Sequence, residues 1–174
     1  ASGNGLSIIN PVVLSNMSYQ KAYTNAVNIG GYFNYTFNKL FSFKSTLGAD
    51  INFLTKNYFD DSLTNTSKNN AGGTPVVRVI NRSVNTFNNS NVLTFSNAKI
   101  NSGFSRLNKI GVFFGQESYM LASKSTDLQE GYFPRGITAD KALGQLNLGT
   151  PFPLNPVTSS TASAIYSLFS RIDY

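Results

Sequence analysis

The sequence predicts an all-β fold, arranged as an antiparallel up-and-down meander of long strands. Three observations support this prediction. Apolar residues recur at every second position in several segments, the connections between these segments alternate between short and long, and most of the polarity comes from neutral side chains. Charged residues make up only 13% of the chain, about half of the roughly 25% that is usual in soluble domains.

The first two strands are predicted at about 26–37 and 41–54 with a short turn between them. Side chains on a strand point to opposite faces with period two, so every second residue shares a face. In the first strand one face is apolar and the other carries amides and hydroxyls. The apolar set is Val27, Ile29, Phe33, Tyr35 and Phe37.

Three further strands are predicted at about 86–97, 109–122 and 163–174. The first of them is the weakest, because Asn residues interrupt the apolar positions of its alternation. The last still alternates where the sequence stops. Each of these runs is rich in the β-branched and aromatic residues that favour strands.

The segments at about 57–85 and 123–163 are rich in Asn, Ser, Gly and Pro, and we expect them to be long loops. The β-branched run at Val76, Val77, Val79 and Ile80 leaves open a short strand within the first. In a meander with alternating short and long links, all long loops lie at one end, as in outer-membrane barrels. Five strands do not close a barrel, since even small barrels have about eight. We therefore expect the 1–174 chain to be a fragment of a β-barrel domain.

Composition excludes several classes of function. The chain has no Cys and no His, which removes thiolate nucleophiles, most zinc sites and the commonest general base. The net charge of +6 is spread singly along the chain, so no nucleic-acid partner is expected. No run approaches the roughly eighteen apolar residues of a membrane helix, but a membrane strand needs only about 9–11 and alternates.

Two environments satisfy the alternation, a lipid bilayer or the second sheet of a soluble β-sandwich. The predicted strands are long compared with the usual five or six residues or so, and aromatics such as Phe37 and Phe41 lie at strand ends. Burying one such side chain is worth roughly 1.5–3 kcal/mol. The apolar face therefore needs lipid or another sheet. The rival to a membrane barrel is a soluble all-β binding or adhesion module.

Four segments resemble the barrel of the SusC-like (RagA-like) TonB-dependent outer-membrane transporters of Bacteroidetes. They are INPVVLSN at 9–16, GYFNYTFNKLFSFKSTLGADINF at 31–53, NVLTFSNAKIN leading into KIGVFFGQES at 91–118, and SLFSRIDY at 167–174. Their order and spacing match over most of the chain.

The resemblance implies a fragment of a barrel of about 22 strands in the outer membrane of a Gram-negative bacterium. It implies as partners the rest of the barrel with its N-terminal plug, a SusD-like surface lipoprotein that acts as a lid, and the TonB complex. It also implies that the cargo is an oligosaccharide or peptide. The plug domain is absent from this sequence. Strands one, three and five are expected to run toward the periplasm, with the loops at 57–85 and 123–163 outside the cell.

The polar face of the first hairpin supplies candidates for the barrel lumen. Within this reading, Tyr32, Asn34, Asp50 and Asn52 would face the water-filled interior. Their alternative role is contact with the plug instead of with cargo.

The loop sequence GYFPRG offers a candidate contact with substrate or lid. Tyr132, Phe133 and Arg135 lie between two glycines, and aromatic faces and a guanidinium suit sugar or peptide contacts. A loop that folds on itself would use the same residues.

No cofactor, metal site or catalytic residue is expected. Asp60 and Asp61 are adjacent carboxylates that suit calcium, but a solvated loop is the favoured explanation for them. Glu117 and Glu130 could be argued as a carboxylate pair for glycoside hydrolysis, but nothing in their spacing fixes the separation that such a pair requires. The chain is therefore not expected to be an enzyme.

Overall fold

The computed structural model describes residue 12 and residues 17–100, 103–151 and 157–174. The INPVVLSN segment at 9–16 therefore lies, apart from Val12, outside the described residues. The chain divides into two compact units. Unit 1 contains the described residues up to Asn25, with Phe53–Arg82 and the described part of Lys124–Ser159. Unit 2 contains Ala26–Asn52, Ser83–Ser123 and Ser160–Tyr174.

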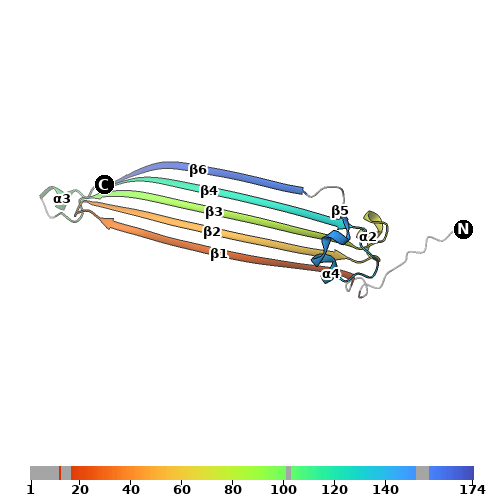
Figure 1. Ribbon diagram of the computed structural model, residues 1–174. Coiled ribbons are helices and arrows are strands. Elements are labelled where there is room, and N and C mark those ends of the chain that lie inside the picture. Colours follow the sequence, from red (N-terminus) through yellow and green to blue (C-terminus); the bar gives the residue numbers. More distant parts are fainter. Residues whose placement is uncertain (1–11, 13–16, 101–102, 152–156) are drawn as a thin grey trace. The chain divides into compact units, whose positions relative to one another are not determined.

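The described chain forms one six-stranded sheet, which confirms the all-β meander (Figure 1). Neighbouring strands follow the order β1-β2-β3-β4-β5, and β6 pairs with β4. The short β5 lies antiparallel to the end of β4, with Glu130 opposite Pro151. The strands are β1 Ser18–Thr36, β2 Phe41–Asp60, β3 Val76–Ser96, β4 Gly111–Gly131, β5 Thr150–Pro151 and β6 Val157–Asp173. The helices are α2 Asn65–Asn70, α3 Gly103–Leu107, α4 Ala139–Gly144 and the 3-10 turn η1 Leu146–Leu148.

The strands are longer than the sequence pattern predicted. β1 begins at Ser18 instead of near 26, and β3 begins at Val76 instead of near 86. The residues added to β1, at 18–25, are mostly Ser, Tyr, Thr and Asn, and those added to β3, at 76–85, include Asn81, Ser83 and Asn85 beside a β-branched run. Polar residues of these types are loop signals in a sequence. The sheet tolerates them because its ladder bonds come from the backbone, so neutral polar side chains do not break a strand that has a polar face.

The connections are correspondingly shorter than expected. The loop predicted at 57–85 shrinks to residues 61–75, and the segment predicted at 123–163 contains the end of β4, the short β5 and the start of β6. The link between β3 and β4, residues 97–110, is nearly as long as the 61–75 link and includes α3. The turn after β1, residues 37–40, is tight. There the Asn38 side chain accepts hydrogen bonds from Leu40 N at 2.8 Å and Phe41 N at 2.9 Å, which stabilises the turn.

Unit 1 contains the buried apolar residues Phe59, Ala71, Pro75, Val76, Val77, Phe133 and Ala142. The main cluster forms where the segment after β4 folds back over β2 and β3. Phe133 and Ala142 from that segment pack with Phe59 and Val77, and Tyr19, Val79, Ile137, Ala139, Leu143 and Leu146 surround them. Tyr132 has φ +60° at this change of direction.

In unit 2 the apolar side chains of β1 and β2 are not covered. Phe33 is 59% exposed and Leu47 is 50% exposed. Val27, Ile29, Tyr35 and Phe37 are exposed as well. No second layer of the described chain lies over these residues, so the described residues do not form a sandwich around unit 2.

Replacing Phe133 by Ala tests whether the segment 132–148 is held over β2 and β3 by this side chain. The ring is 1% exposed, and Phe→Ala in a core costs about 3–5 kcal/mol, so the segment 132–148 should open locally. Amide hydrogen exchange of residues 137–148, measured on the complete protein, should accelerate strongly. Leu148→Ala is the control, because Leu148 is 39% exposed and its loss should leave exchange nearly unchanged. Equal exchange in the two variants would contradict the assigned core.

Candidate functional site

A chain of hydrogen bonds crosses the polar face of unit 2 from β1 to β3. Asn28 on β1 donates its side-chain amide to Oδ1 of Asp50 on β2, and the Thr86 hydroxyl on β3 donates to Oδ2 at 2.9 Å. Both carboxylate oxygens of Asp50 therefore have neutral donors from neighbouring strands. This network links three strands by polar contacts on one face.

The predicted lumen residues lie on the same face as this network. The even-numbered residues of β1 and β2 share a face of the sheet. The contact between Lys44 and Tyr32 shows this, since the Lys44 ammonium lies 5.6 Å from the Tyr32 ring centroid. Asn34 shares the parity of Tyr32, and Asn52 shares that of Asp50. The structure thus places all four candidates on one face, and their exposure to a lumen stays a prediction.

The odd-numbered positions of β1 and β2 form an aromatic surface. Tyr35 and Phe37 meet edge to face at 4.9 Å, and Phe41 lies 5.2 Å from Phe95 on β3. Phe33 stacks beside Tyr35 at 6.3 Å. Rings at these separations attract one another, so this surface carries two groups of contacting rings, one along β1 and one between β2 and β3.

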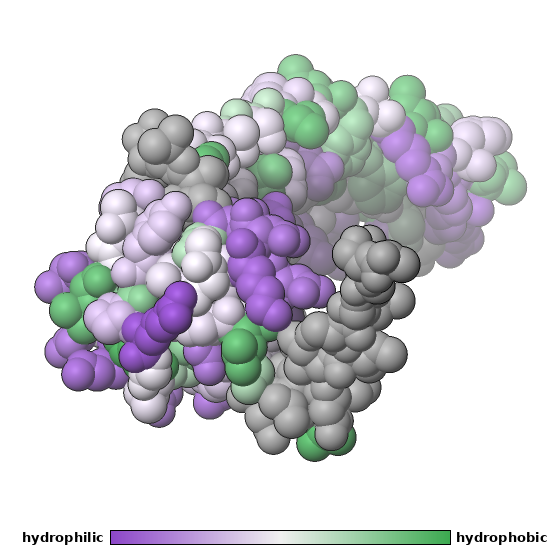
Figure 2. Space-filling view, turned by 90° about the vertical axis from the view of Figure 1, so that its right-hand side faces the viewer, coloured by the Kyte–Doolittle hydropathy of each residue, from purple (hydrophilic) through white to green (hydrophobic). Residues whose placement is uncertain are grey.

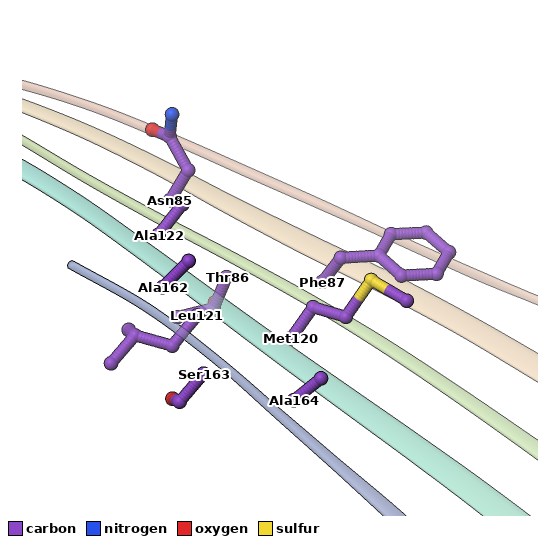
Figure 3. Close-up of a pocket in the computed structure, with 9 residues that line it drawn as sticks. All are labelled: Asn85, Thr86, Phe87, Met120, Leu121, Ala122, Ala162, Ser163 and Ala164. Atoms are coloured by element: carbon purple, nitrogen blue, oxygen red, sulfur yellow. The ribbon is translucent and has the colours of Figure 1, made fainter. Parts of the chain in front are cut away.

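A groove of about 410 Å³ lies where β3, β4 and β6 run side by side in unit 2. Figure 3 shows Phe87 and Met120 next to one another, with Ala162 and Ala164 on the same side of the strands, whereas Leu121 and Ser163 extend to the opposite side. The small alanines leave a hollow between larger apolar side chains. The groove therefore belongs to an apolar face and offers little polar recognition.

Unit 1 holds an ion pair between β3 and β4. Arg78 binds Asp127 through Nε at 2.9 Å and 3.2 Å and through Nη2 at 2.5 Å. Two nitrogens facing two oxygens is the geometry in which Arg–carboxylate pairs are strongest. Both residues lie in the ranges expected outside the membrane, and their hydrogen bonds lower the pKa of Asp127 and raise the pKa of Arg78.

Beside this pair lies a polar pocket of about 200 Å³ in unit 1, formed by β2, β3, β4 and α2. We call it the Asp60 pocket. It is lined by Tyr58, Asp60, Thr66, Val76, Arg78 and Gln129. Figure 2 looks onto the end of unit 1 that carries α2 and α4, where hydrophilic and neutral side chains predominate. The pocket combines a carboxylate, a phenol, a hydroxyl and an amide, which together suit a hydrogen-bonding ligand.

The structure separates the three loop candidates. The Phe133 ring is buried in the core, so it holds the loop in place and is not available to touch cargo or lid. Tyr132 is 54% exposed. Arg135 is exposed and lines a second hollow, of about 270 Å³, together with Lys141 and Leu148.

The adjacent carboxylates Asp60 and Asp61 each accept a hydrogen bond from a serine. Asp60 Oδ1 accepts from the Ser18 hydroxyl at 2.9 Å, and Asp61 Oδ1 accepts from Ser62 N at 2.6 Å. Among the described residues no group of three or more His, Cys, Asp or Glu side chains is placed to hold a metal ion. No described helix is long and apolar enough to cross a membrane.

Sequence reasoning missed the Asp60 pocket. It assigned 57–85 and 123–163 to loops, so it did not assign Tyr58, Arg78 and Gln129 to either face of a sheet. The run VVRVI at 76–80 did carry a signal, because Arg78 alternates with Val77 and Val79. Read as a strand, that run would have put a guanidinium on the polar face.

Comparison with known proteins identifies a fold relationship. No protein-family model and no curated protein matches the chain. The solved RagAB peptide importer in its open-open state matches with a TM-score of 0.65 and 17% identity, and the RagAB peptide transporter with 0.66 and 16%. Each match covers 91% of this chain and 16% of the other. The closed-closed state matches with 0.64 and 14%, over 90% and 16%.

The chain therefore spans about one sixth of the length of the importer chains that share its fold. At these identities the likeness establishes the fold. It agrees with the RagA-like resemblance found in the sequence motifs, and the proteins that share the fold are described as importers or transporters and not as enzymes.

A double-mutant cycle on Arg78→Gln and Asp127→Asn should measure the ion pair between β3 and β4. The side chains are 46% and 27% exposed, so water screens the pair and the coupling should be about 0.2–1 kcal/mol. It should fall further in 1 M salt. Urea unfolding of the complete protein in vesicles provides the measurement. A coupling that is zero at low salt would mean that the pair does not form.

Proposed function

We propose that this chain is part of the barrel wall of a SusC-like TonB-dependent outer-membrane transporter of Bacteroidetes, with a barrel of about 22 strands. The observation that carries the proposal is the bare apolar face of unit 2. Phe33 and Leu47 are at least half exposed, and the described chain has no layer to cover them. Acyl chains cover such a face in a membrane barrel.

In this proposal the polar face of unit 2 borders the water-filled interior. Tyr32, Asn34, Asp50 and Asn52 lie on that side. The hydrogen bonds of Asp50 to Asn28 and Thr86 link neighbouring strands of the wall, and the polar side chains give it a surface that water hydrates. The groove beside Phe87 and Met120 faces lipid. The wall then separates a polar path from hydrocarbon without any covalent chemistry.

The cargo and the partners follow from the same proposal. The solved proteins that share the fold are named as a peptide importer, which favours peptides over oligosaccharides as cargo. A SusD-like surface lipoprotein would close the cavity over the outer loops, where Tyr132 and Arg135 are exposed. The plug and the segment that contacts the TonB complex would lie in other parts of the polypeptide.

A soluble all-β module is the alternative. It requires a second sheet over the odd-numbered positions of β1 and β2, and within the described residues no such sheet exists. A partner chain would have to supply it. The two possibilities differ in how tightly the whole protein is held by a membrane.

Single-cysteine variants should report the two faces, since the chain has no cysteine of its own. Tyr32→Cys and Asn52→Cys should react with a charged, membrane-impermeant thiol reagent in intact outer membranes. Phe33→Cys and Leu47→Cys should react roughly tenfold more slowly or less, because hydrocarbon excludes the charged reagent and disfavours the thiolate. The rates are read from gel shifts of the complete protein. Equal rates at positions 32 and 33 would rule out a wall with one face in lipid.

Fractionation of cells that carry the complete protein separates the membrane proposal from its alternative. A barrel should stay with the outer membrane after washing with 1 M salt and with carbonate, and should leave it only in detergent, because its contacts are hydrophobic. Release of the protein by salt alone would favour the soluble module.

A further inference from the structure

The Asp60 pocket of unit 1 is lined with several polar groups by the strands themselves. β2 contributes Tyr58 and Asp60, β3 contributes Arg78, and β4 contributes Gln129. Side chains on paired strands are held more firmly than side chains on a free loop. The pocket is therefore preformed, which lowers the entropic cost of binding.

Helix α2 closes one side of this pocket, and buried hydrogen bonds hold the helix in place. The hydroxyl of Thr64 accepts from Ser67 N at 3.2 Å at the start of the helix. Ser67, which is fully buried, donates its own hydroxyl to the Asp60 carbonyl at 3.1 Å. At the other end Gly73, with φ +75°, donates its N–H to Ser67 O at 2.9 Å. These bonds bring Thr66 to the rim of the pocket.

The charges of the pocket do not cancel. The guanidinium of Arg78 is matched by Asp127 through three short contacts. Asp60 has one neutral donor, the Ser18 hydroxyl on Oδ1. None of the described lysine or arginine side chains forms an ion pair with Asp60. The unmatched charge of the pocket is therefore negative and lies on the Asp60 carboxylate.

We infer that the Asp60 pocket binds a primary ammonium group of a peptide cargo. The inference rests on the proposed function as an importer. An ammonium has three donors, and the pocket presents the Asp60 carboxylate, the Thr66 hydroxyl and the Gln129 amide oxygen as acceptors. The Tyr58 ring adds a face that attracts cations. Val76, which is buried, offers an apolar wall for the methylene groups that precede a lysine ammonium.

The same chemistry has two sources in a peptide, the lysine side chain and the free amino terminus. Three pentapeptides separate them on the complete transporter, purified in detergent and titrated by calorimetry. The first is N-acetylated with a central lysine, the second is its acetylated norleucine analogue, and the third is the norleucine peptide with a free amino terminus.

The wild-type protein should bind at least one of the two ammonium-bearing peptides about tenfold more tightly than the acetylated norleucine peptide, which corresponds to about 1.4 kcal/mol. The peptide that gains affinity identifies the source. Asp60→Asn, which keeps the size of the side chain and removes its charge, should abolish the preference.

Asp61→Asn is the matched control. It removes the same formal charge one residue further along, outside the residues that line the pocket, and should retain the preference. Retention of heat-modifiable migration on gels shows that each variant keeps its folded barrel.

Equal binding of all three peptides by wild type, or an unchanged preference in Asp60→Asn, would overturn the inference and leave peptide import standing. A protein that binds none of the three would overturn the peptide cargo as well. The two failures are therefore distinguishable.

Discussion

A β-strand sends alternate side chains to opposite faces, and in unit 2 one of these faces is a band of aromatic and aliphatic groups with no cover from the described chain. Exposing several large apolar side chains to water costs roughly 1.5–3 kcal/mol for each. Such a face persists only where another apolar medium meets it. This constraint is the reason why we assign the Asp50 network to the aqueous side of the wall and the groove at Met120 to the apolar side. The likeness to importer chains agrees with that assignment.

Unit 1 meets the same constraint in a different way. Its strand residues Phe59 and Val77 are covered by the chain itself, because the segment after β4 folds back and inserts Phe133. Covering these residues from within requires no lipid. A unit that buries its own apolar residues suits the aqueous side of a membrane, and an uncovered unit suits the hydrocarbon. This difference agrees with the proposed position of the long connections outside the cell.

Polar groups in this chain are mostly satisfied by neutral partners. Asp50 accepts from an amide and a hydroxyl, and the buried Ser67 bonds to the backbone of Asp60. Ion pairs are few, and the Arg78–Asp127 pair is the strongest in geometry among those of the described residues. Asp60 likewise has a neutral donor, the Ser18 hydroxyl, and its carboxylate lines a pocket formed by strand residues.

The sequence alone determined the fold class and the two faces of the first hairpin, because the period of two at Val27–Phe37 is a local property of extended backbone. It placed Tyr32, Asn34, Asp50 and Asn52 on one side for the same reason. Only the tertiary structure decided where strands end, since the polar segments before Asn85 and after Ser123 pair through backbone bonds that composition does not reveal. Likewise, it decided that Phe133 is core while Arg135 is exposed, and that Asp60 shares a pocket with Tyr58 and Gln129. Those outcomes depend on contacts between residues far apart in the chain, which no local pattern encodes.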